Sequence, residues 1–133
     1  MDLAERISQM SYAKRLKVGS VIVKENTILS YGWNGMPTDW ENTCEVELED
    51  GSLKTKQEVL HSEMNALMKV ARSTESTEGA TLFCTHAPCI DCAKAIYQAG
   101  ISTVYYRDEY RDDAGIRFLK QGGVNVHQYT YSS

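Results

Sequence analysis

The chain has 133 residues, a length typical of one domain with its own hydrophobic core, and we expect a single domain over residues 1–133. Asp and Glu (18) outnumber Lys and Arg (14), and no run of like charge is long enough for a nucleic-acid tail, which argues against general attraction to polyanions. The N-terminus has no apolar signal core and no later stretch resembles a membrane span. We therefore expect a cytoplasmic protein (host cytoplasm for a viral source) without a membrane partner.

The first predicted element is a helix, and the next two are strands. A helix over residues 2–15 is indicated by apolar side chains at helical spacing, namely Leu3, Ile7, Met10 and Ala13. Two β-rich runs follow at residues 18–25 and 27–33. The dipeptide Glu25-Asn26 between them is expected to be the turn of a β-hairpin.

A long polar segment separates this hairpin from the next helix. Residues 34–57 carry turn residues, and they predict a loop with room for a short acidic hairpin. From Glu58 the pattern turns helical, until the Ser/Thr-rich residues 73–79 end the run. The side chains expected to face the core are Leu60, Met64, Leu67, Met68 and Ala71.

The C-terminal half alternates strands and helices. Strands are predicted at residues 81–85, 101–106 and 124–129, and helices at residues 88–100 and 112–121. The complete order is α-β-β-α-β-α-β-α-β. It predicts an α/β protein with helices on both faces of one mixed sheet.

Residues 87–94 read APCIDCAK and hold two of the four cysteines. Pro88 is suited to the first position of a helix, because its φ angle is preset and that position needs no amide donor. Cys89 and Cys92 then share one face of the first turn, where the helix dipole favours the thiolates that bind metal. A redox dithiol, half of a structural zinc site and two ligands of a catalytic metal all use this geometry.

A histidine upstream distinguishes these alternatives. His61 lies in VLHSEMNAL, at the expected start of the second helix. Alone, such a histidine is more often a hydrogen-bonded structural residue, but it precedes the Cys-x-x-Cys by only one strand. One imidazole and two thiolates with a fourth position left to water are typical of a catalytic zinc. Cys44 or Cys84 could instead complete a closed, four-ligand site.

Glu63 is the carboxylate best placed to serve such a zinc. A water bound to zinc ionises near neutral pH, and a neighbouring carboxylate can take its proton and return it elsewhere. Residues two apart do not share a helix face, so His61 and Glu63 converge only if the metal lies over the helix end. Two helix N-termini would then point at one metal ion.

The segments HSE and PCIDC together resemble the His-x-Glu and Pro-Cys-x-x-Cys signature of the zinc-dependent cytidine deaminase superfamily. The resemblance implies that His61, Cys89 and Cys92 bind Zn²⁺ and that Glu63 is the catalytic proton shuttle. It also implies a three-layer α/β/α sandwich around a five-stranded mixed sheet.

Further segments are similar to the deoxycytidylate deaminases, in particular to short viral and bacterial forms: VGSVIV, SYGWNGMP, HSEMNAL and THAPCIDCAKAIYQAGI. The similarity covers residues 18–123. It implies hydrolytic deamination of dCMP to dUMP with release of ammonia, supplying dUMP for thymidylate synthesis. It also implies a homo-oligomer, up to a hexamer, and dCTP and dTTP as effectors.

The resemblance also suggests substrate contacts. Asn34 is expected to contact the sugar and base, the backbone of Ser62 and Ala87 the base, and Tyr110 the deoxyribose-phosphate side. Arg15, just before the first strand, is a candidate for the 5′-phosphate, although a solvated surface charge is the alternative role for any such cation. Other candidate cations are Lys17, Arg107 and Arg111.

Other cytosine substrates share the metal motif. These are dCTP, deoxycytidine or cytidine, and a base in tRNA or single-stranded DNA. The acidic balance and the lack of a basic, aromatic track argue against a polynucleotide, whereas dCTP differs from dCMP only in phosphate number. Outside enzymes, the alternative is a non-catalytic, zinc-stabilised nucleotide-binding module, against which Glu63 and the open fourth position argue.

Overall fold

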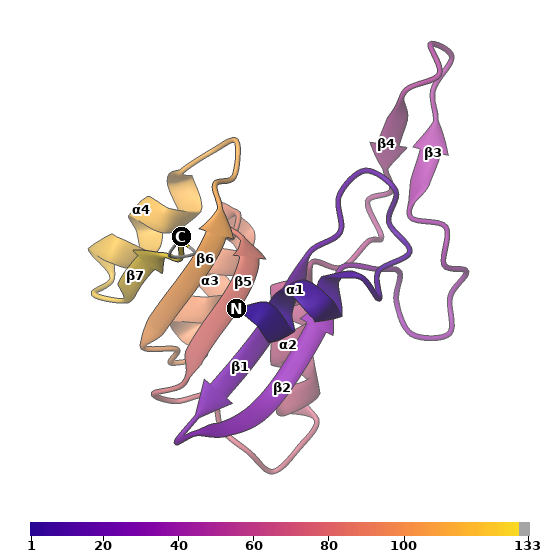
Figure 1. Cartoon of the computed structure of the whole chain (residues 1–133). Coiled ribbons are helices and arrows are strands. Elements are labelled where there is room, and N and C mark those ends of the chain that lie inside the picture. The colour runs from indigo at the N-terminus through magenta and orange to yellow at the C-terminus, as the bar shows by residue number, and fades with distance from the viewer. Residues whose placement is uncertain (131–133) are drawn as a thin grey trace.

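The computed structural model describes residues 1–130, so the last three residues of the predicted domain lie outside the described part. Figure 1 shows the arrangement of the helices and strands. In chain order they are α1 (Asp2–Ser8), β1 (Gly19–Lys24), β2 (Thr27–Trp33), β3 (Glu45–Glu47), β4 (Leu53–Thr55), α2 (Ser62–Ala71), β5 (Thr81–His86), α3 (Ile90–Gln98), β6 (Thr103–Asp108), α4 (Ala114–Gln121) and β7 (Asn125–Gln128).

Five strands form one mixed sheet in the order β2-β1-β5-β6-β7. β1 is antiparallel to β2 and β5, whereas β5, β6 and β7 are parallel and are joined by α3 and α4, because parallel neighbours need a crossover. In Figure 1, α1 lies in front of the sheet and α2 and α3 lie behind it. The predicted three-layer α/β/α sandwich with a five-stranded mixed sheet is confirmed.

The predicted hairpin between β1 and β2 is also confirmed. Glu25 and Asn26 both have positive φ angles, 51° and 61°. This conformation matches the twist of paired strands in two-residue hairpins. The main core lies behind the sheet, where apolar strand residues such as Ile22 and Leu82 pack against helix residues such as Ile96 and Leu119.

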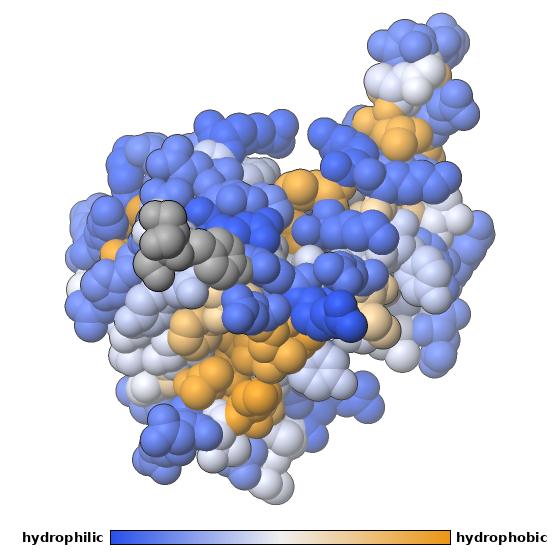
Figure 2. Space-filling model, viewed as in Figure 1, coloured by the Kyte–Doolittle hydropathy of each residue, from blue (hydrophilic) through white to orange (hydrophobic). Residues whose placement is uncertain are grey.

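The front face of the sheet is only partly covered, because α1 has seven residues. Figure 2 shows apolar side chains gathered below α1, over β1 and β5. On the same sheet, the half-buried rings of Phe83 and Tyr105 stack with their centroids 5.1 Å apart, and Tyr105 lies equally close to His127.

Every helix within residues 1–130 is too short or too polar to cross a membrane.

The predicted first helix is wrong in length and in its buried face. It ends at Ser8, and its buried residue is Ala4 while Leu3 is exposed. Beyond it, polar side chains capture the backbone: the Ser11 hydroxyl accepts a hydrogen bond from Ala13 N–H and donates to the Asn34 carbonyl oxygen. These bonds replace the helical ones, because each amide has one proton to donate.

α2 begins later than predicted and turns a different face to the core. Residues 58–61 precede the helix, and Leu60 instead exchanges two backbone hydrogen bonds with Gly35. The predicted core residues Met68 and Ala71 are exposed. The buried positions are Ser62, Glu63, Ala66, Leu67 and Val70. The buried face thus includes the predicted proton shuttle.

The loop predicted at residues 34–57 contains the acidic hairpin, which projects from the body of the protein (Figure 1). We call residues 45–55, which comprise β3, β4 and their turn, the arm. Its residues Val46, Leu48 and Leu53 are at least one-third exposed. A two-stranded hairpin is marginally stable alone, so the arm depends on what its root contacts.

A close approach at Gly32 sets the position of α2. A Cβ atom at this position would lie 2.5 Å from the Ser62 carbonyl oxygen and 2.7 Å from the Ala66 amide nitrogen. Both are backbone atoms of α2, so the helix itself would have to move. Gly32 thereby lets the first turn of α2 lie directly against β2.

We expect Gly32→Ala to lower the free energy of unfolding by about 1–3 kcal/mol, the usual cost of overpacking. Thermal unfolding would show a melting temperature several degrees below that of the wild type. Gly35→Ala is the matched control, because a Cβ there meets no atom closer than Trp33 Cδ1 at 3.8 Å. Equal melting temperatures for the two variants would contradict this account of the α2 contact.

Candidate active site

A cavity of about 590 Å³ opens at the carboxyl ends of β5 and β6, a volume typical of small-molecule sites. Open α/β sheets commonly bind ligands at this edge. The cavity is lined from the segment before β1, the end of β2, the arm, the start of α2 and the ends of β5 and β6. Its lining residues include every predicted site residue except Cys92: Arg15, Asn34, His61, Ser62, Glu63, Ala87, Cys89 and Tyr110.

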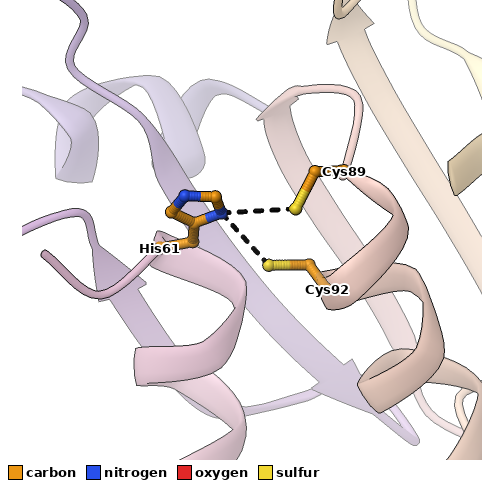
Figure 3. A group of neighbouring side chains, drawn as sticks. All are labelled: His61, Cys89 and Cys92. Carbon is orange, nitrogen blue, oxygen red and sulfur yellow. Dashed lines mark hydrogen bonds between the residues drawn. The ribbon is translucent and has the colours of Figure 1, made fainter. Parts of the chain in front are cut away.

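Three potential metal ligands point toward one another (Figure 3), and two of them, His61 and Cys89, line this cavity. His61 is the N-cap of α2, Cys89 is the N-cap of α3, and Cys92 lies in the first turn of α3. His61 Nδ1 lies 3.5 Å from Cys89 Sγ and 3.3 Å from Cys92 Sγ. Two helix N-termini therefore point at one place. The prediction that Pro88 is the first residue of this helix is wrong. α3 begins at Ile90, and Pro88 precedes the N-cap.

The three ligand atoms compete for protons. Hydrogen bonds from Cys92 and His61 lower the pKa of Cys89 to about 3, and the bond with Cys89 together with burial raises the pKa of Cys92. The hydrogen bond with Cys89 also raises the pKa of His61. A cation among the three atoms would relieve this competition, since it binds the thiolates and the neutral imidazole directly.

The donor set fits zinc. One nitrogen and two sulfurs, all within 4.8 Å of one another, form the one such cluster of metal-ligating side chains in residues 1–130. Zinc prefers these donors, and three protein ligands leave a fourth position open for catalysis. Cys84 does not complete the set: it is buried on β5, and burial raises its pKa well above the usual value. Cys44 lies next to the arm and contacts the Asn42 carbonyl oxygen.

Glu63 lies beside this cluster and is 4% exposed. The hydroxyl of Ser62 donates a 2.6 Å hydrogen bond to Glu63 Oε1, and Ser20 Oγ lies 2.7 Å from Ser62 Oγ. Because the Ser62 proton goes to Glu63, Ser20 is the donor in the second bond. This chain of hydroxyls fixes one oxygen of the carboxylate. The Ser62 side chain therefore faces Glu63, whereas the sequence suggested only a backbone role for this residue.

α4 supports the metal ligands from behind. A Cβ atom at Gly115 would overlap the Pro88 carbonyl oxygen and lie 2.8 Å from the Cys89 carbonyl oxygen. α4 thus packs directly on the backbone that carries Cys89. Ala87 is held by a 2.8 Å hydrogen bond from its amide to the Asp108 carbonyl oxygen, which links this segment to β6.

Asn34 lines the cavity, and its side chain also connects the end of β2 to the segment before β1 by two hydrogen bonds. Its Oδ1 accepts a hydrogen bond from Val18 N–H at 2.9 Å, and its Nδ2 donates to the Leu16 carbonyl oxygen at 2.8 Å. The second Nδ2 hydrogen is the remaining donor that a substrate could use.

The predicted cations separate into two groups. Arg15 and Arg111 line the cavity, the latter with its guanidinium 5.7 Å from the centroid of the Tyr110 ring. Arg107 instead pairs with Glu5 and Asp108, each at about 3 Å. The ammonium of Lys17 donates to the Ser11 carbonyl oxygen.

The sequence analysis did not identify several cavity residues. Glu45 and Thr55 come from the root of the arm, and Glu109 comes from the segment after β6. The contacts that bring the arm to the cavity are tertiary and leave no periodic pattern. His86, at the end of β5, also lines the cavity, and its position just before the Cys-x-x-Cys segment indicates this in the sequence.

Comparison with known proteins relates this site to one family. The family described as "Cytidine and deoxycytidylate deaminase zinc-binding region" matches residues 1–108. ComE operon protein 2 of Bacillus subtilis is 35% identical over 132 residues, which are 96% of this chain and 68% of the relative. The deoxycytidylate deaminase of Enterobacteria phage T4 is 32% identical over 147 residues, covering 83% of this chain and 76% of the phage protein.

A solved structure gives the same relationship in three dimensions. The dCMP deaminase of the cyanophage S-TIM5, crystallised in complex with dCMP and dUMP, superposes with a TM-score of 0.89. It is 53% identical in sequence, and the match covers 96% of this chain and 92% of the cyanophage protein. Since the family match includes all three metal ligands and Glu63, the chain belongs to the cytidine and deoxycytidylate deaminase family of zinc-binding proteins.

Proposed function

We propose that the protein is a zinc-dependent dCMP deaminase, which converts dCMP and water to dUMP and ammonia. The observation that carries this proposal is the His61, Cys89 and Cys92 cluster beside Glu63, at a cavity that two arginines also line. The relatives named deoxycytidylate deaminase and the cyanophage complex with dCMP and dUMP support it. The dUMP product would supply thymidylate synthesis.

We assign three residues to zinc binding and a fourth, Glu63, to the proton transfers. When bound by His61, Cys89 and Cys92, zinc supplies a water activated as a nucleophile near neutral pH. We assign Glu63 as the group that takes a proton from the attacking water and delivers it to cytosine N3. The same carboxylate then moves the proton of the new C4 hydroxyl to the amino group, so that ammonia departs and the C4 carbonyl of dUMP remains. Because Ser62 donates a hydrogen bond to Oε1, we assign the proton transfers to Oε2.

We assign the remaining cavity residues to substrate binding. The Ser62 backbone amide and the Ala87 carbonyl oxygen are proposed to contact the cytosine, and the free Nδ2 hydrogen of Asn34 the sugar and base. Tyr110 and Arg15 are proposed for the deoxyribose-phosphate end. Guanidinium groups suit this role, since they bind phosphate oxygens in bidentate fashion.

The proposed function is tested by ammonia release from dCMP, dCTP, CMP, deoxycytidine and cytidine, with and without a chelator. We expect dCMP to be the preferred substrate, and chelation to abolish activity that added zinc restores. Preference for deoxycytidine would contradict the phosphate assignments, and preference for dCTP would move the protein to a different substrate. A non-catalytic nucleotide-binding module would bind dCMP without releasing ammonia.

A homo-oligomer, up to a hexamer, is also proposed. Its support is the apolar surface over β1 and β5 (Figure 2) and the exposed Val46, Leu48 and Leu53 of the arm. Surfaces of this kind are typical of contacts between protein chains. Regulation by dCTP and dTTP and the cytoplasmic location stay predictions.

A further inference from the structure

The root of the arm contributes a buried carboxylate to the cavity. Glu45 and Thr55 are cross-strand partners in β3 and β4, and both line the cavity. Glu45 is 7% exposed, the only buried acidic residue of residues 1–130 besides Glu63. The proposed chemistry gives Glu45 no part, so its burial needs another explanation.

Glu45 and Thr55 both form hydrogen bonds with the segment that carries Arg15. Glu45 Oε2 accepts hydrogen bonds from the amides of Lys14 at 2.8 Å and Arg15 at 3.0 Å. Thr55 Oγ1 accepts a 3.0 Å hydrogen bond from Arg15 Nη1. One strand pair therefore holds Arg15 at its backbone and at its guanidinium.

These contacts matter because the segment has no regular structure of its own. Residues 11–18 belong to neither a helix nor a strand, so no hydrogen-bond ladder fixes the Arg15 backbone. A carboxylate that accepts two consecutive amides forms charge-assisted hydrogen bonds, which are stronger than neutral ones. Glu45 therefore fixes the backbone position of Lys14 and Arg15, which no helix or strand does.

Arg15 also keeps its charge available. Within residues 1–130, no carboxylate lies at salt-bridge distance from its guanidinium, whereas Arg107 is paired with two acids. Thr55, its side-chain partner, is neutral and occupies one of the five N–H donors. The described part of the chain offers no partner to the other side-chain donors, which leaves them for an anion entering the cavity.

We propose that Glu45 is a positioning residue that sets the preference for substrates with a 5′-phosphate. It does not touch the substrate; it holds Arg15 in place to bind the phosphate, with Thr55 fixing the side chain. This inference rests on the proposed dCMP deaminase function. In this proposal the arm is part of the substrate site, and the burial of the Glu45 carboxylate is explained by its bonds to the Arg15 segment.

The test compares a nucleotide with its nucleoside. In Glu45→Ala, the ratio of kcat/KM for dCMP to that for deoxycytidine should fall roughly tenfold, through KM for dCMP. Arg15→Ala should lower the same ratio by on the order of 10- to 100-fold, the range for hydrogen bonds to charged groups. The double variant should be no worse than Arg15→Ala alone, since the two residues act as one unit.

Three further variants separate positioning from general support. Glu45→Gln keeps an oxygen that can accept the two amides, so it should recover much of the ratio. Thr55→Val removes the side-chain acceptor and should lower the ratio by a smaller factor. It also provides a test if Glu45→Ala fails to fold. Glu47→Ala changes an exposed carboxylate on the same strand and is the matched control.

Binding measurements provide a readout independent of turnover. Calorimetric titration with dUMP and with deoxyuridine gives the affinity gained from the phosphate, which should fall in Glu45→Ala by the same factor as the kinetic ratio. Equal losses for phosphorylated and unphosphorylated ligands, or an unchanged ratio, would overturn the inference. A wild type that releases no ammonia would refute the proposed function instead, and the titrations would still decide the role of Glu45.

Discussion

Glu63→Gln is expected to lower kcat for dCMP by about 10²–10⁴-fold, the usual contribution of a general acid–base residue. Glutamine has nearly the same shape and can accept the Ser62 hydroxyl hydrogen bond at its oxygen. It cannot take up and release a proton at neutral pH. The variant should therefore fold, bind metal and bind dCMP, but fail in both proton transfers.

Ammonia release and zinc content, measured on the same preparation, test this expectation. Glu58→Gln is the matched control, since Glu58 is half-buried just before α2 but does not line the cavity. Full turnover by Glu63→Gln with zinc bound would show that another group carries the proton. Loss of zinc along with activity would instead point to a structural role for the carboxylate.

Cys92→Ala is expected to lose zinc and, with it, the deaminase activity. Cys92 is 3% exposed, and its sulfur is one of three ligands. Residues that merely orient a metal ligand contribute about 10–100-fold to metal affinity, so removal of a ligand should cost at least about 100-fold. Metal analysis after gel filtration, together with ammonia release, measures both effects.

Cys84→Ala is the control for this variant. Cys84 is also buried, but its sulfur is outside the ligand cluster, so the variant should keep one zinc per chain. The pair of variants also tests the alternative that Cys89 and Cys92 form a redox dithiol. A dithiol would make activity sensitive to thiol oxidants and indifferent to chelators, and Cys92→Ala with full zinc content would contradict the metal assignment.

The metal ligands could be predicted from the sequence because each depends on a short local pattern. His61 and Glu63 lie in one turn, as do Cys89 and Cys92, so the start of each helix alone orients each pair. The turn at Glu25-Asn26 was equally local. The α-β alternation then required a layered sheet, since parallel strands need helical crossovers.

The features that were wrong or missed depend on distant contacts. Apolar spacing predicted that Met68 faces the core, but the buried face of α2 is set by β2, where Gly32 admits the backbone around Ser62. The first helix does not extend to residue 15, because Glu45 accepts hydrogen bonds from the amides of Lys14 and Arg15. Glu45 is 30 residues from Arg15 in sequence, and no periodic pattern connects them.

The contact of Gly115 with the Cys89 backbone bears on how the site forms during protein synthesis. A nascent chain that has emerged as far as residue 108 already contains the whole family motif, including the ligands and Glu63. It still lacks α4, against which the Pro88–Cys89 backbone packs. Tight metal capture should therefore wait until α4 has left the ribosome, and early emergence of the motif should not by itself produce a loaded enzyme.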